Sequence, residues 1–149
     1  MRTLLFAVNC LVFAGLPAAA LEKEMVGKIV QSAQNIARDA NNVNQALKTK
    51  KFDAATVTKN IEAMEADIAV LHEVVAKFEA TNPTFTDRDR ADWKLLKDKV
   101  QLIEIMHGQK KKLAAEDFAK NRSMVRAHAT GLAMRAKRLQ ATAEKLSRG

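Results

Sequence analysis

The feature that most constrains this chain is an apolar run between Val57 and Phe78 that neither Gly nor Pro interrupts. Its members are spaced alternately four and three residues apart, an average of about 3.5 residues. They are Val57, Ile61, Met64, Ile68, Leu71, Val75 and Phe78. This period is typical of a helix that packs along a seam against other helices. The run therefore predicts one long helix that needs helical neighbours.

A comparable seam precedes this run and predicts another helix, from about Glu22 to Lys48. The seam residues are Met25, Ile29, Ala33, Ile36, Ala40, Val43 and Leu47. A short connection leads to Asp53, which suits the N-cap position of the second helix. That second helix is expected to end near Ala80, because Pro83 disfavours helical backbone at the residue before it.

The second half of the chain predicts two further helices joined by a turn over residues 115–120. The third helix begins where Thr86 or Asp87 caps it and continues to about Ala114. Its apolar residues cover an arc broad enough to contact two neighbours. They are Trp93, Leu95, Leu96, Val100, Leu102, Ile103, Ile105 and Met106. The seam of the fourth helix is Val125, Ala129, Leu132, Ala136, Leu139, Ala143 and Leu146.

Four helices of similar length joined by short loops predict an all-α, up-down-up-down antiparallel four-helix bundle. The chain has only 5 Gly and 2 Pro among 149 residues, which favours long helices. One alternative stays open. The third and fourth helices would fuse into one long helix, and the resulting three-helix chain would dimerise. Both alternatives predict a single helical domain over residues 21–149.

The first twenty residues have the pattern of a cleaved export signal. Arg2 supplies a positive charge, residues 4–16 are almost continuously apolar, and Ala18 to Ala20 are the small residues that a signal peptidase requires. We therefore expect cleavage near Ala20 and a periplasmic or secreted mature protein without a transmembrane helix. Cys10, the only cysteine, would leave with the signal, so the mature bundle would depend on helix packing alone.

Two histidines are the candidate ligands of a metal or haem site. His107 and His128 lie about ten residues before and after the predicted turn, so they would be level on adjacent helices. Imidazoles at a helix seam bind transition metals or haem, and Glu104 forms a Glu-x-x-His motif with His107. Di-iron bundles need two such motifs, however, and Glu104 falls on the polar side of its helix. We therefore interpret both histidines first as half-buried structural residues near a polar end of the bundle.

The charge pattern is more informative about function. The chain has a formal charge of +8, its fourth helix is almost uniformly basic, and its second helix is acidic. In a square bundle these two helices lie on a diagonal, and the first connection and the end of the third helix place more lysines at one end. The candidate anion- or partner-binding residues are Lys48, Lys50, Lys51, Lys110, Lys111, Lys112, Lys120, Arg122 and Arg126.

The sequence contains no motif for a nucleophile–base pair, a phosphate loop or a zinc protease, so we expect a non-enzymatic protein without a cofactor. Its basic end would bind an anionic envelope component or an acidic protein. No nucleic-acid-reading motif is present, and self-association stays open. A basic surface also keeps small proteins soluble. The alternative is a metal- or haem-binding bundle, for electron transfer or metal storage, that uses His107 and His128.

Overall fold

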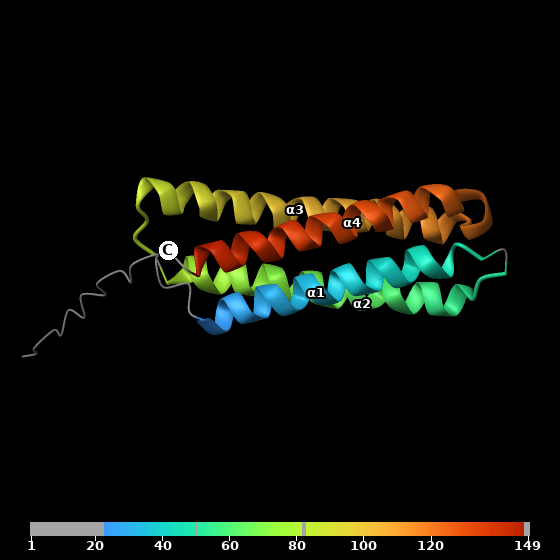
Figure 1. The fold of residues 1–149 in the computed structure, drawn as a ribbon, viewed down its shortest axis with the longest axis horizontal. Coiled ribbons are helices and arrows are strands. Elements are labelled where there is room, and N and C mark those ends of the chain that lie inside the picture. The colour runs from blue at the N-terminus through green and yellow to red at the C-terminus, as the bar shows by residue number, and fades with distance from the viewer. Residues whose placement is uncertain (1–22, 50, 82, 148–149) are drawn as a thin grey trace, which may run out of the picture.

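The structure is a computed structural model that describes residues 23–49, 51–81 and 83–147. Over these ranges it contains four α-helices and no strand, consistent with the predicted four-helix bundle (Figure 1). The helices are α1 (Lys23–Ala46), α2 (Ala54–Ala80), α3 (Asp87–Glu116) and α4 (Phe118–Leu146). The expected signal segment 1–20, Cys10 and Lys50 lie outside the described residues.

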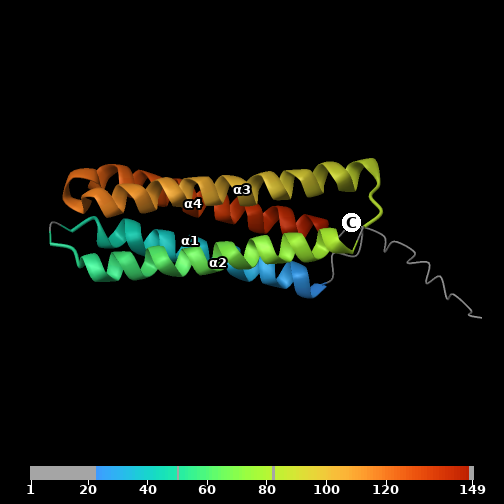
Figure 2. The same ribbon diagram turned by 180° about the vertical axis from the view of Figure 1, so that it is seen from behind.

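The four helices lie side by side along the long axis of the molecule, as Figures 1 and 2 show from opposite sides. Helix α1 packs against α2 and α4, and α3 packs against the same two helices. Acidic α2 and basic α4 therefore lie on a diagonal. This placement separates the two charge populations across the width of the bundle.

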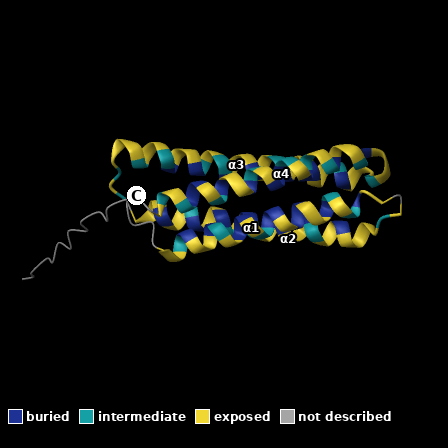
Figure 3. Cartoon of the chain, in the orientation of Figure 1, coloured by how far each residue is buried: buried dark blue, intermediate teal, exposed yellow. Residues whose placement is uncertain are grey.

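The buried residues form a continuous core between the four helices (Figure 3). The predicted seams of α1 and α4 are confirmed, with Met25 and Leu146 only partly buried at the ends. In α2, Val74 rather than Val75 is buried. The broad apolar arc predicted for α3 is wrong, because only Trp93, Leu96, Val100 and Ile103 of that set are buried. Leu95, Leu102 and Ile105 are 46%, 40% and 50% exposed.

The junction between α3 and α4 differs from both predictions made for it. Asp117 alone separates the two helices, with extended backbone at φ −170° and ψ 108°. Its Oδ1 accepts hydrogen bonds from the backbone N–H groups of Ala119 (2.8 Å) and Lys120 (3.1 Å), which satisfies two donors at the start of α4. The predicted turn over residues 115–120 is therefore too long. The fused third and fourth helix is wrong, because the helix stops at Asp117.

Candidate functional site

The first connection and the α3–α4 junction lie together at one end of the molecule. The rings of Phe52 and Phe118, from these two places, meet edge to face with centroids 5.8 Å apart. The Arg122 guanidinium donates a hydrogen bond from Nε to the carbonyl oxygen of Leu47. These contacts bring lysines from three chain segments, the first connection, α3 and α4, to one end. We call the exposed members the basic end, and they are Lys48, Lys51, Lys112 and Lys120.

The amines of the basic end are free of ion pairs within the described residues. Other predicted members already make ion pairs or hydrogen bonds with groups of the same chain. Lys111 pairs with Glu65 at 2.7 Å, and Arg126 donates from Nε to the side-chain oxygen of Asn44 at 3.1 Å. The half-buried guanidiniums of Arg122 and Arg126 thus already make hydrogen bonds that connect α4 to the end of α1 and to Leu47 just after it.

Lys110 does not belong to the basic end, and its assignment as an anion-binding surface residue is wrong. Its side chain has 0% exposure, and its Nζ lies 3.2 Å from the Met64 sulfur. The reason is helical position. The buried seam of α3 continues beyond Ile103 in steps of four and three, through His107 and Lys110 to Ala114.

Lys110 belongs instead to a group of polar side chains inside the bundle, which we call the interior polar cluster. Its polar members are Asp39 on α1 and His107 and Lys110 on α3, and the Met64 thioether of α2 contacts Lys110. Burial lowers the pKa of Lys110 to about 7, while the nearby charge of Asp39 acts in the opposite direction. Burial, reinforced by the charge of Lys110, lowers the pKa of His107 to about 4. The cluster therefore holds a neutral imidazole and a readily neutralised amine near neutral pH.

The predicted histidine site is only partly assembled. His107 is 5% exposed and neither ring nitrogen has a hydrogen-bond partner, so it makes no hydrogen bond to His128. His128 is half-buried, and its Nδ1 also has no partner. Glu104 points elsewhere, because its carboxylate lies 3.1 Å from Nε2 of His72 on the surface. Within the described ranges no three His, Cys, Asp or Glu side chains gather as metal ligands.

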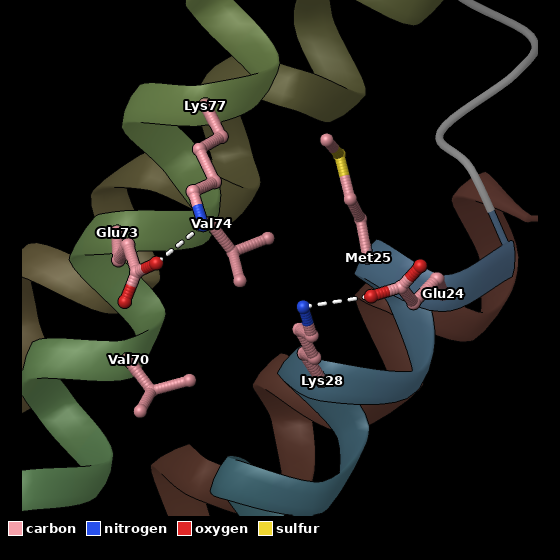
Figure 4. A pocket seen from close by; sticks show the side chains of 7 residues that line it. All are labelled: Glu24, Met25, Lys28, Val70, Glu73, Val74 and Lys77. Atoms are coloured by element: carbon pink, nitrogen blue, oxygen red, sulfur yellow. Dashed lines mark hydrogen bonds and ion pairs between the residues drawn. The ribbon is translucent and has the colours of Figure 1, made fainter.

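A surface pocket of about 390 Å³ lies between the start of α1 and the end of α2 (Figure 4). Its floor is apolar, with Met25, Val70 and Val74, and its charged rim consists of two ion pairs. One is Lys28 with Glu24, at 2.8 Å, and the other joins Lys77 to Glu73. Because each of these rim charges already has a partner, the pocket offers little to a charged ligand.

Among the helices that the structure describes, none is both long and apolar enough to cross a bilayer. Comparisons with protein-family models, with curated proteins and with solved structures found no match. The features of the described structure that bear on function are therefore the basic end, helix α4 and the interior polar cluster.

Proposed function

We propose that this chain is an exported, non-enzymatic, up-down-up-down bundle that binds an anionic partner through its basic end and α4. The observation that carries the proposal is the charge of α4, which has seven Lys and Arg residues and one acid, Glu144. Helix α2, on the diagonal, has two basic residues and five acids. An anionic partner would therefore meet one side and one end of the molecule, where its approach is favoured within about 10 Å at ordinary salt.

The antiparallel topology supports the proposal because it brings the basic residues together. The hydrogen-bonded pairs Asn35–Asp67 and Asn42–Asn60 join rising numbers on α1 to falling numbers on α2. That order is expected of two helices that run in opposite directions. It places the end of one helix beside the start of the next.

The proposal is tested by binding of the exported protein to a soluble polyanion, polyglutamate, at several salt concentrations. A variant with Lys51→Gln, Lys112→Gln and Lys120→Gln should bind at least about tenfold more weakly, since each cation near an anionic surface contributes on the order of 1 kcal/mol. The matched control removes three exposed lysines elsewhere, with Lys28→Gln, Lys77→Gln and Lys94→Gln. Equal losses in the two variants would show that net charge, rather than the basic end, attracts the polymer.

Export is tested separately by mass spectrometry of the protein recovered outside the cytoplasm. A mass that begins at Leu21 would support cleavage after Ala20. Retention of residues 1–20 would contradict that part of the proposal and would leave the charge argument intact.

A second candidate function is metal or haem binding, and the unpartnered nitrogens of His107 favour it. A thioether, a neutral imidazole and a readily neutralised amine suit a soft transition metal. Met106 on α3 faces Gly131 on α4. His128 therefore lies within about one helical turn of the level of His107 along the bundle axis. A visible spectrum and a metal analysis of the purified protein test this candidate. Stoichiometric metal or haem that is lost in His107→Ala would replace the first proposal.

A further inference from the structure

Every large hydrophobic residue that the structure shows as exposed lies on α3 or α4. On α3 these are Leu95, Leu102 and Ile105, and on α4 they are Met124 and Met134, each 40–53% exposed. Within the described parts of α1 and α2, no large apolar side chain is exposed to this degree. Because the five exposed apolar residues are confined to two adjacent helices, they indicate one outer face of the bundle rather than random exposure.

The contacts between α3 and α4 show where these apolar side chains lie. Lys99 donates a hydrogen bond to the Thr142 hydroxyl at 2.7 Å, and Met106 faces Gly131. Leu102 is three residues after Lys99 and Met134 is three residues after Gly131, so each lies beside a contact position on its own helix. In this register Leu102 is nearly level with Met134. The two side chains therefore flank the line along which α3 packs against α4, and Ile105 lies one turn from Leu102 on α3.

Cations lie along the same line of contact between α3 and α4. The Arg135 guanidinium lies beside Gly131, with Nη1 3.5 Å from the position that a Cβ there would take. Burial, and then the neighbouring charge of Arg138, lowers the pKa of Lys99. Lys99 and Arg138 are therefore close enough to repel each other. Neither they nor Arg135 makes an ion pair within the described residues.

The two acids nearest this face are already engaged. Asp92 accepts from Lys145 at 2.9 Å, and Asp98 pairs with Lys94 at 2.8 Å. The apolar side chains are thus bordered by cations that make no ion pair in the described structure, although the charge of Asp92 partly offsets that of Lys99. We call this surface the apolar–basic face, and its central residues are Lys99, Leu102, Ile105, Met134, Arg135 and Arg138.

We propose that the apolar–basic face docks on the surface of an anionic phospholipid bilayer, which names the partner class in the function proposed above and rests on it. Leucine, isoleucine and methionine enter the boundary between head groups and acyl chains, while adjacent Lys and Arg pair with lipid phosphates. A soluble polyanion would use the cations and gain nothing from the apolar side chains. A second copy is disfavoured, because a two-fold contact would bring Arg135 and Arg138 against their own equivalents.

The test is sedimentation of the exported protein with vesicles of phosphatidylglycerol and phosphatidylcholine, beside vesicles of phosphatidylcholine alone. Leu102→Ser with Met134→Ser should weaken binding to the anionic vesicles about tenfold or more and leave polyglutamate binding unchanged. The matched control is Ala66→Ser with Ala76→Ser, two exposed sites on α2. Arg135→Gln with Arg138→Gln should weaken vesicle binding more than Lys28→Gln with Lys77→Gln. Circular dichroism verifies that each variant remains helical.

Several outcomes would overturn the inference. If the wild-type protein binds polyglutamate but not anionic vesicles, the bilayer-docking inference is wrong and the proposed anion binding stands. If the wild-type protein binds neither polyglutamate nor anionic vesicles, both the bilayer-docking inference and the proposed function are wrong. Vesicle binding that the Leu102→Ser, Met134→Ser variant retains would show that residues outside the apolar–basic face bind the membrane. Capture of an acidic protein that requires Leu102 and Met134, without vesicle binding, would assign the face to a protein partner.

Discussion

Lys110 places an amine where no water reaches it. Its one hydrogen-bond acceptor in the described structure is the Met64 thioether, a weak acceptor that stabilises an ammonium poorly. An unpaired buried charge is costly, so the amine gives up its proton more easily than an exposed lysine does. This residue therefore couples the stability of the bundle to pH.

Burial lowers the pKa of Lys110 from 10.5 to about 7 in the folded protein. Between these values the unfolded chain holds a proton that the folded protein has released, so the free energy of unfolding should rise with pH across this window. Below about pH 7 Lys110 is charged in both states, and its destabilising effect is complete. Urea unfolding of the wild type at a series of pH values measures the slope.

Lys110→Met should remove this slope and stabilise the bundle at pH 7 by on the order of 1–3 kcal/mol, because an apolar side chain of similar length replaces a buried charge. Lys111→Met is the matched control at the next residue. Lys111 is exposed and paired with Glu65, so its loss should change stability by less than about 1 kcal/mol. Destabilisation in Lys110→Met at pH 7 would mean that the ammonium is better compensated than its contacts indicate.

His107 should add a second, lower window. Burial lowers its pKa from 6.5 to about 4. Between these values the unfolded chain again holds the extra proton, so the free energy of unfolding should fall as the pH drops from about 6.5 to about 4. His107→Gln, followed by the same urea titration, should flatten this region. A fall of the same steepness in the variant would assign it to the carboxylates instead.

At the scale of the element, Asp117 is the one residue that separates α3 from α4. Without this break the chain would form three helices instead of four. Both residues beside it are helical, and α3 with 30 residues and α4 with 29 flank it. The Asp117 carboxylate caps α4, and Asn121 donates from its side chain to the Leu113 carbonyl at 3.0 Å. These bonds satisfy backbone groups that a sharp reversal leaves open.

Asp117→Ala should lower the free energy of unfolding by roughly 1 kcal/mol, the usual loss for an N-cap. Glu116→Ala, one residue earlier, is the control, since the Glu116 side chain is exposed and makes no hydrogen bond in the described structure. Thermal unfolding monitored by circular dichroism compares the two. Equal melting temperatures for both variants would show that the reversal is held by packing rather than by the cap.

The helices were predictable because heptad-like spacing encodes burial directly. Ile29, Leu71 and Leu132 are buried where their seams predict them. Lys110 was misplaced because a charged side chain indicates a surface, although its spacing from Ile103 places it on the seam. Leu95 and Leu102 were misplaced for the opposite reason, since apolar side chains indicate a core. The apolar–basic face could not be inferred without the register between α3 and α4, which depends on contacts between distant residues.

At the scale of the whole molecule, three polar contacts that each include an acid join α2 to α3 at intervals of seven residues. They are Glu65 with Lys111 (2.7 Å), His72 with Glu104 (3.1 Å) and Glu79 with Lys97 (2.6 Å). The acid lies on α2 in the outer pairs and on α3 in the middle one. A shift of one heptad would bring acids beside acids, so this alternation disfavours wrong registers.

Reversing one charge of a pair in this series should lower the free energy of unfolding, whereas reversing both charges of that pair should leave it nearly unchanged. Glu65→Lys places two lysines together and should reduce stability by up to about 1 kcal/mol, and Lys111→Glu in the same chain should restore most of it. Glu62→Lys serves as the control, because Glu62 is exposed and has no ion pair in the described structure. A double-mutant cycle from urea unfolding gives the coupling. A coupling of zero would show that the pair is only a surface contact.

The position of Lys110 also makes it a chemical reporter of how often the bundle opens. Every other lysine in the described ranges is exposed or half-buried and should react promptly with an acylating reagent. Lys110 can react only when α3 separates from its neighbours, and its amine is then as nucleophilic as any other. The slow fraction of modification, located by peptide mass spectrometry, would therefore measure the population of opened molecules under native conditions.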